Sequence, residues 1–179
     1  MSEQYSLWLL PPPEQYKRLQ RVISKLSQQY STPLLEPHVT LYGRIIDEEA
    51  QIIDTIRELA GRLSPPLINF NGFSLWDEFF RSIFMEAERT AELEQAYQAA
   101  HTLFEPFLHP RYRGREFIPH LSLMYGNIPT EEKGKIIASL DRDLLTSFLV
   151  DNVSLYRLRQ EPAEWVKVRD FAFRNILSS

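Results

Sequence analysis

Two short segments of the chain carry a histidine two residues before a hydroxyl side chain. They are residues 37–41 (PHVTL) and residues 119–123 (PHLSL), and the residues around each pair are apolar. In a β-strand, alternate side chains lie on the same face, so His38 shares a face with Thr40. His120 and Ser122 are related in the same way. Each strand would present an imidazole and a hydroxyl on one face and bury aliphatic side chains on the other.

These residue types can catalyse phosphoryl chemistry when two such faces meet. Imidazole donates or accepts a proton near neutral pH, so one histidine could deprotonate an attacking water while the other protonates the departing oxygen. The hydroxyls of Thr40 and Ser122 could hydrogen-bond the non-bridging phosphate oxygens. The sequence has no HxH, no HExxH and no cysteine with which to build a metal site. We therefore expect neither a metal nor a cofactor.

The two motifs belong to a longer internal similarity. Residues 74–76 (SLW) reappear as residues 154–156 (SLY), at an offset of 80, and the histidine motifs are related by an offset of 82. Two matches at nearly one offset predict an internal repeat of about 4–78 and 80–158, with an extra strand at 164–173. We expect a single domain over 1–179. A pseudo-twofold axis between the halves would bring both histidine faces to one cleft.

The pattern of apolar residues predicts the elements that position these motifs. Helices are expected at 14–30, 48–63 and about 91–104, the last capped by Thr90, and a fourth is opened by Pro129-Thr130. Strands are expected at 5–10, 34–42, 67–76, 81–88, 117–125, 148–158 and 164–173. Residues 109–116 have no period and form a basic loop. A solvated surface loop is the interpretation favoured for it, and a flap over nucleotide phosphates or a base is the alternative.

Composition limits the classes of protein and ligand. The 179 residues carry 20 Lys and Arg against 24 Asp and Glu, giving a net charge of −4, and 44% are hydrophobic. This balance is globular, and its mild acidity argues against binding long nucleic acid, although a small anion held by a few local side chains fits. No apolar run is long enough for a membrane span or a secretory signal. We expect a cytoplasmic monomer that does not engage membranes.

Three stretches resemble a known family: residues 5–12 (YSLWLLPP), 36–43 (EPHVTLYG) and 118–126 (IPHLSLMYG). Paired motifs of this kind resemble the 2H phosphoesterase superfamily. Within it the chain is similar to the cyclic phosphodiesterases that act on 2′,3′-cyclic nucleotides and ADP-ribose 1″,2″-cyclic phosphate. Plant relatives carry cysteine pairs that this chain lacks, so any redox regulation through them is absent.

The resemblance implies roles for six residues. The catalytic residues would be His38, Thr40, His120 and Ser122, and the substrate-binding residues would be Tyr125 and Trp8. His120 would be the base that activates water and His38 the acid, although near-symmetric geometry allows the roles to swap. Trp8 could equally be a core residue, because leucines surround it.

We therefore expect an α+β fold with two pseudo-symmetric lobes, each an antiparallel sheet with helices on its outer face, around a central cleft. The expected activity is metal-independent hydrolysis of ribose cyclic phosphates to phosphomonoesters. One alternative is an RNA-end enzyme of the 2′-5′ RNA ligase type or an oligonucleotide phosphodiesterase. Another is a non-catalytic module that binds nucleotides or RNA.

Overall fold

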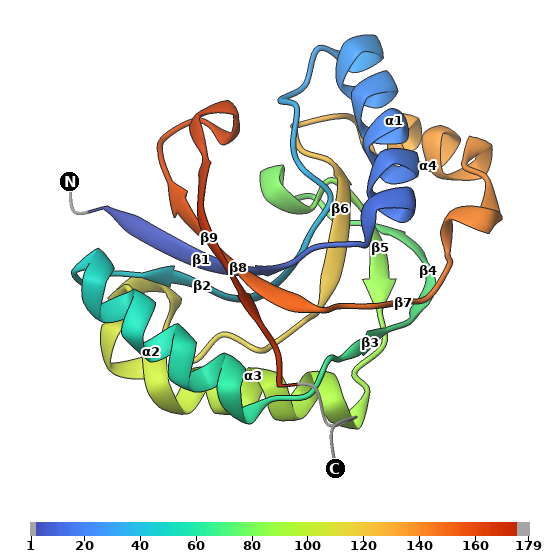
Figure 1. Ribbon diagram of the computed structural model, residues 1–179. Coiled ribbons are helices and arrows are strands. Elements are labelled where there is room, and N and C mark those ends of the chain that lie inside the picture. Colours follow the sequence, from blue (N-terminus) through green and yellow to red (C-terminus); the bar gives the residue numbers. More distant parts are fainter. Residues whose placement is uncertain (1–2, 175–179) are drawn as a thin grey trace.

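The computed structural model describes residues 3–174, and this part of the chain contains four α-helices and nine β-strands (Figure 1). The helices are α1 (Pro13–Tyr30), α2 (Glu49–Arg62), α3 (Ala91–Phe104) and α4 (Thr130–Ser139). The strands are β1 (Gln4–Leu9), β2 (Val39–Ile45), β3 (Leu67–Ile68), β4 (Phe70–Leu75), β5 (Ile83–Ala87), β6 (His120–Met124), β7 (Phe148–Leu149), β8 (Asn152–Leu158) and β9 (Val166–Ala172). No helix within residues 3–174 combines the length and the apolar character that a membrane crossing requires.

The helices begin and end where local chemistry favours it. Helix α1 opens with a proline in its first turn, where the missing N–H costs no hydrogen bond, and ends at Ser31, which has a left-handed backbone (φ 51°). Its buried residues Leu19, Ile23 and Leu26 follow the predicted helical spacing. Helix α3 starts after Thr90, whose side chain accepts a hydrogen bond from the Leu93 amide. The predicted helices are confirmed to within about one residue at the ends that the sequence specified.

Seven strands form one antiparallel sheet in the order β4-β5-β6-β2-β1-β8-β9, and β3 pairs with β7 in a separate ladder. At the centre, β2 and β6 are joined at the pair Val39–Leu121. Exchanging β1 with β5, β2 with β6 and β4 with β8 reverses the order of the first six strands and keeps every neighbour. The strand order therefore has an approximate twofold relation about an axis between β2 and β6.

The predicted α+β fold is confirmed, and the lobes are built in an unexpected way. We expected a separate sheet in each lobe, whereas β4-β5-β6 and β2-β1-β8-β9 are joined edge to edge through β6 and β2. Strands are also exchanged between the predicted repeats. Strand β4, from 4–78, pairs with β5, and β8, from 80–158, pairs with β1. The internal repeat itself stays a prediction.

The helices cover the sheet with the same approximate symmetry. Helix α3 packs on β2 and α1 packs on β6, while α2 lies against β8 and β9 and α4 against β4. In Figure 1, α2 and α3 lie together below the sheet, and α1 lies beside α4. The Tyr30 hydroxyl of α1 donates a hydrogen bond to Glu132 of α4.

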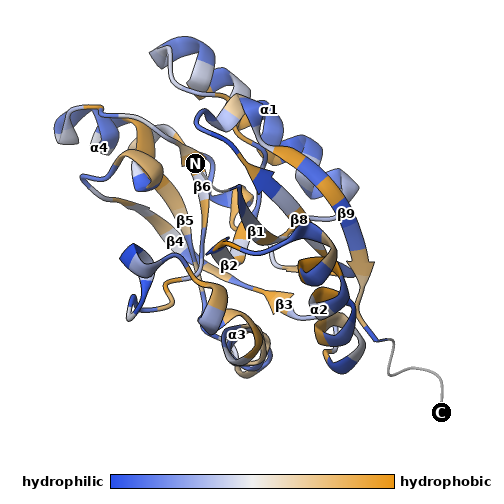
Figure 2. Ribbon diagram, turned by 90° about the vertical axis from the view of Figure 1, so that its left-hand side faces the viewer, coloured by the Kyte–Doolittle hydropathy of each residue, from blue (hydrophilic) through white to orange (hydrophobic). Residues whose placement is uncertain are grey.

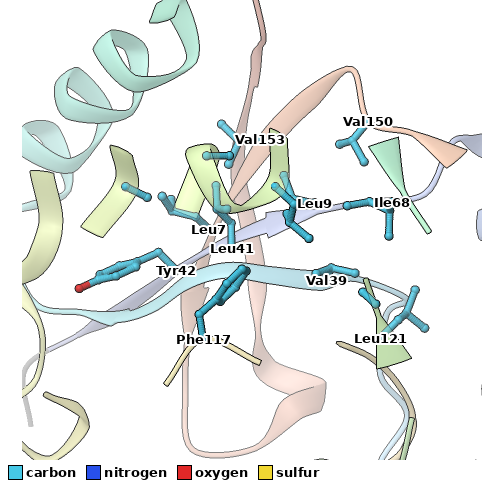
Figure 3. Packing of buried hydrophobic residues seen from close by; sticks show 14 of the residues in the cluster. Leu7, Leu9, Val39, Leu41, Tyr42, Ile68, Phe117, Leu121, Val150 and Val153 are labelled. Atoms are coloured by element: carbon cyan, nitrogen blue, oxygen red, sulfur yellow. The ribbon is translucent and has the colours of Figure 1, made fainter. Parts of the chain in front are cut away.

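The main core lies on the helix-covered face of the sheet. Leu7, Leu9, Val39, Leu41 and Val153 alternate along β1, β2 and β8 and are at most 1% exposed (Figure 3). In Figure 2 the helices carry both hydrophilic and hydrophobic residues, as expected for elements with one face on this core. Because alternate residues point the other way, these strands leave a second face on which polar side chains can gather.

Four predicted strands differ from the observed ones, and proline explains two of these differences. Strand β2 begins at Val39 rather than at residue 34, and β6 begins at His120 rather than at residue 117. Pro37 and Pro119 lack the N–H that a ladder needs, so regular pairing starts only after them. The predicted strands 67–76 and 148–158 are each divided in two, into β3 and β4 and into β7 and β8.

Candidate active site

The central junction of the sheet brings the two histidine motifs together. Strands β2 and β6 are antiparallel, so residues on either side of their shared pair lie across from one another. His38 therefore lies opposite Ser122. Thr40 lies opposite His120. The four side chains alternate with buried aliphatic neighbours and stand on the face of the sheet away from the main core.

Both imidazoles are fixed by the same local hydrogen bond. The Nδ1 atom of His38 lies 2.7 Å from the Glu36 carbonyl oxygen, and Nδ1 of His120 lies 2.8 Å from the Ile118 carbonyl oxygen. A carbonyl only accepts, so Nδ1 must carry the proton and donate in each pair. In the neutral rings Nε2 is then the unprotonated nitrogen, free to exchange a proton with a ligand.

The His38 ring is also held by aromatic stacking. It lies on the Trp8 indole with ring centroids 3.6 Å apart and planes 7° apart, and the far face of Trp8 stacks on Tyr156 at 3.7 Å. The Tyr156 hydroxyl donates to the Glu36 carboxylate at 2.5 Å, and the Glu36 carbonyl accepts from His38. These contacts link His38, Trp8, Tyr156 and Glu36 in a closed ring of four residues.

His120 occupies a different environment. The edge of Phe84 meets its ring at a centroid distance of 5.3 Å and an interplanar angle of 67°. The Arg81 guanidinium lies close enough for its positive charge to lower the pKa of His120. The two histidines therefore have matched backbone contacts but different neighbours.

Burial favours the neutral form of both rings. Loss of solvent contact lowers the pKa of His38 to about 3, although its hydrogen bond to the Glu36 carbonyl raises it and repulsion from His120 lowers it further. Burial likewise lowers the pKa of His120 to about 4. In the ligand-free protein both histidines are neutral at pH 7. A bound anion would favour protonation of either ring.

The predicted hydroxyls are not equivalent. Thr40 lines the cavity beside the histidines. Ser122 is 4% exposed, and its hydroxyl donates to the Phe80 carbonyl at 3.2 Å. Tyr125, at the end of β6, lies in the cavity wall, and burial raises the pKa of its phenol, an effect that Ser122 and Arg44 partly offset. Ser122 would need to turn from its carbonyl partner to reach a phosphate.

A cavity of about 790 Å³ opens over these residues. It is lined by His38, Thr40, His120, Trp8 and Tyr125, and also by side chains that the sequence analysis did not single out, among them Arg44, Phe80, Arg81 and Trp165. Trp165 comes from the β8–β9 hairpin, which projects at the upper left of Figure 1. Its ring stacks on Phe80 at a centroid distance of 6.3 Å. Arg44 directly follows residues 36–43, the stretch that contains the first histidine motif, and this adjacency was the sequence signal that could have placed Arg44 at the site.

The basic loop 109–116, for which we favoured a solvated surface, lies along the same cavity. It contains a short 3-10 turn (Pro110–Tyr112), and Arg111, Tyr112 and Arg115 line the wall. The lining includes four arginines against two glutamates. The cavity is therefore locally cationic in a chain whose net charge is −4. Within residues 3–174, no group of three His, Asp or Glu side chains gathers in a way that could hold a metal ion.

Comparison with known proteins identifies the family to which this chain belongs. Residues 1–154 match the family described as "Cyclic phosphodiesterase-like protein". A 2′,3′-cyclic-nucleotide 3′-phosphodiesterase of Saccharomyces cerevisiae is 27% identical over 69% of this chain and 65% of its own length. A cyclic phosphodiesterase of Arabidopsis thaliana is 25% identical over 72% of this chain and 68% of its own. The aligned region spans just under two thirds of the yeast relative.

Solved structures share the fold. A protein of Thermus thermophilus superposes with a TM-score of 0.68 at 17% identity, covering 97% of this chain and 99% of that one. Apo LigT of E. coli gives a TM-score of 0.67 at 14% identity, over 97% and 98% of the two chains. LigT has also been crystallised with 3′-AMP. At these identities the likeness shows the fold.

Proposed function

This chain belongs to the cyclic phosphodiesterase-like protein family, and on that premise we propose that it hydrolyses ribose cyclic phosphates to phosphomonoesters by two-histidine acid–base catalysis without a metal. The substrates would be 2′,3′-cyclic nucleotides or ADP-ribose 1″,2″-cyclic phosphate. His38, Thr40, His120 and Ser122 would be the catalytic residues. Tyr125 and Trp8 would contact the substrate.

One observation carries the proposal. Two imidazoles from segments 82 residues apart in sequence line a single cavity, and each is fixed through Nδ1 to a backbone carbonyl. Binding alone does not require two oriented proton-transfer groups. An in-line displacement at phosphorus requires a base on the attacking side and an acid on the departing side.

The proton balance closes over one turnover. The acid histidine first takes up a proton at Nε2 from solvent when the anionic substrate binds. Nε2 of the other, neutral histidine then removes a proton from water as the new P–O bond forms, and the imidazolium donates its Nε2 proton to the ribose oxygen as the old P–O bond breaks. Thr40 and Arg81, which is within electrostatic range of His120, would stabilise the charge that develops on the non-bridging oxygens. The product leaves with the proton from the acid, and exchange with solvent restores both rings.

The family resemblance implies that His120 is the base and His38 the acid. The Arg81 charge disfavours protonation of His120, which suits the base. Burial lowers the pKa of both rings, to about 3 for His38 and about 4 for His120, so the anionic substrate must raise the pKa of whichever ring acts as the acid.

The test is an assay of the purified protein against ADP-ribose 1″,2″-cyclic phosphate and the four 2′,3′-cyclic mononucleotides. His38→Ala and His120→Ala should each lower kcat by at least about 10²-fold while leaving the far-ultraviolet circular dichroism unchanged. His109→Ala, in the loop 109–116 but at a residue that is not in the cavity wall, is the matched control. EDTA should have no effect. Near-normal turnover by either active-site variant, or strong EDTA inhibition reversed by added metal, would refute the mechanism.

The alternative classes predict other outcomes of the same assay. A non-catalytic nucleotide-binding module would bind these compounds without turning them over. An RNA-end or oligonucleotide enzyme would prefer an oligomer ending in a cyclic phosphate to the mononucleotide. Cytoplasmic location and a monomeric state stay predictions, and size-exclusion chromatography with light scattering tests the latter.

A further inference from the structure

Four arginines line the cavity, and none of them has a carboxylate oxygen within 4 Å among residues 3–174. Arg44 and Arg81 are half-buried, and Arg111 and Arg115 are exposed. Glu116, beside Arg115 in sequence, pairs with Arg89 instead. Half-buried guanidinium groups usually pair with carboxylates, so the uncompensated Arg44 and Arg81, with two more arginines in the same wall, indicate a site for an anionic ligand.

Tyr112 links two of these arginines. The Arg44 Cζ atom lies 5.1 Å from the centre of the Tyr112 ring, and the Arg115 Cζ atom lies 4.7 Å from it. Arg44 also lies 5.8 Å from the Phe80 ring. Contact with an aromatic ring holds a guanidinium in place without using its N–H groups. Arg44 donates one N–H to the Gln4 side chain at 3.2 Å, and its other N–H groups can donate to a ligand.

The loop that carries Tyr112 is fastened to β2 beside Arg44. The His109 amide donates to the Arg44 carbonyl at 2.9 Å, and Ile45 and Leu108 form an antiparallel bridge. Arg44 itself has a left-handed backbone with φ of 62°, which is unfavourable for a residue with a side chain. The fold therefore keeps Arg44 next to the loop at a local conformational cost.

The arginines extend outward from the catalytic histidines. Arg81 is within electrostatic range of both His120 and Arg115, and Arg44 lies four residues along β2 from Thr40. Arg44 is within range of Tyr125. A ligand whose cyclic phosphate lies between the histidines would therefore meet Arg44 and Arg115 with a more distant part of the same molecule.

We propose that Arg44, Tyr112 and Arg115 form a second subsite, which binds a further phosphoryl group of the substrate. This inference rests on the proposed function and narrows it: the preferred substrates carry a cyclic phosphate and a separate phosphate. Guanidinium N–H groups match phosphate oxygens in geometry and charge, and a purely apolar or neutral extension of the ligand would leave these cations unpaired.

The test compares two substrates that differ in one group, adenosine 2′,3′-cyclic phosphate and its 5′-phosphorylated form. The wild-type protein should turn over the 5′-phosphorylated form with a kcat/KM at least about tenfold higher, mainly through a lower KM, since a charge-assisted contact contributes about that much. Arg44→Gln and Arg115→Gln should each reduce this preference to about threefold or less. Raising the ionic strength should weaken it.

Arg113→Gln is the matched control. Arg113 lies in the same loop and carries the same charge, but it is not in the cavity wall, and its guanidinium donates to the Pro106 carbonyl. The Arg113→Gln variant should keep the full preference for the 5′-phosphorylated substrate. The subsite would be overturned if the wild-type protein had equal kcat/KM values for the two substrates. It would also be overturned if both Arg44→Gln and Arg115→Gln kept the preference for the 5′-phosphorylated form. Absence of turnover with either substrate would instead refute the proposed function.

The second phosphate could come from a diphosphate bridge or from an internucleotide linkage. Two further substrates distinguish these sources: ADP-ribose 1″,2″-cyclic phosphate and an adenylate dinucleotide ending in a 2′,3′-cyclic phosphate. Either substrate would support the subsite if the kcat/KM measured with it falls more in Arg115→Gln than in Arg113→Gln. The larger wild-type kcat/KM then identifies which source fits the cavity. If neither substrate distinguishes the two variants, the subsite is refuted.

Discussion

His38 and His120 have related positions and different surroundings, which determines how they should titrate. Burial lowers the pKa of His38 to about 3 and that of His120 to about 4. We expect both rings to be neutral at pH 6 in the free protein, and a saturating nucleoside monophosphate to raise at least one pKa by more than one unit, since its negative charge favours an imidazolium. Histidine-selective NMR titration measures the pKa of each ring in the free and in the ligand-bound protein. Rings that titrate near 6.5 in the free protein would contradict this prediction.

The stacked ring of contacts around His38 gives a second prediction at this scale. Tyr156→Phe removes the hydroxyl that hydrogen-bonds Glu36, and so loosens the residue whose carbonyl orients His38. We expect kcat to fall about three- to tenfold with little change in KM, because the orientation of the proton donor changes rather than the binding surface. Tyr30→Phe removes a tyrosine–glutamate hydrogen bond between α1 and α4 and is the control. Equal effects of the two variants would show a general structural loss.

At the scale of elements, α4 supports the segment that carries Phe80 and Arg81. Lys133 of α4 is 1% exposed, and its Nζ donates to the Trp76 carbonyl at 2.8 Å and lies 3.5 Å from Asp77. Lys133→Met leaves that carbonyl without this donor, so we expect a loss of about 1–3 kcal/mol in the free energy of unfolding, measured by urea denaturation. Lys135→Met, on the same helix but exposed, should change it by less than about 0.5 kcal/mol. Similar losses in both variants would show that the buried contact is not responsible.

Local sequence patterns predict most helices and strands, but they do not predict which strands are neighbours in the sheet. Helical spacing and proline positions place α1 to α4, and each histidine motif identifies its histidine, because these signals each lie within a few residues. The expectation that His38 and His120 share a site comes from the similarity of the two motifs, which lie 82 residues apart. The stacking of Trp8 on His38 depends on β1 being the neighbour of β2, and the position of Arg81 depends on β5 being the neighbour of β6. Such pairings join distant segments, and a short window of sequence carries no signal for them.

The whole molecule combines a net negative charge with a cationic cavity, and the sequence predicts only the first. The net charge is a sum over 179 residues, whereas the cavity collects Arg44 from β2, Arg81 from the β4–β5 connection and Arg115 from an aperiodic loop. Burying two histidines in this cavity has a further consequence for the entire fold, because their protonation is coupled to unfolding.

This coupling predicts loss of stability in mild acid. In the unfolded chain the histidines have a pKa near 6.5, and in the folded protein burial lowers those of His38 and His120 to about 3 and about 4. As pH falls below 6.5 the unfolded state binds more protons than the folded state, so the free energy of unfolding decreases. For His38 the decrease between pH 6.5 and 5 should be about 1.5 kcal/mol.

Urea denaturation at half-unit pH steps measures this slope. Carboxylates with lowered pKa values, such as Glu49 and Glu94, reduce stability only below about pH 4.5, outside this window. His38→Gln removes one titrating group, so its free energy of unfolding should depend less steeply on pH between 6.5 and 5, whatever its absolute value. His109→Gln is the matched control. A slope that His38→Gln leaves unchanged would show that the ring is solvated in the folded protein, and the neutral, oriented imidazole on which the mechanism depends would then be lost as well.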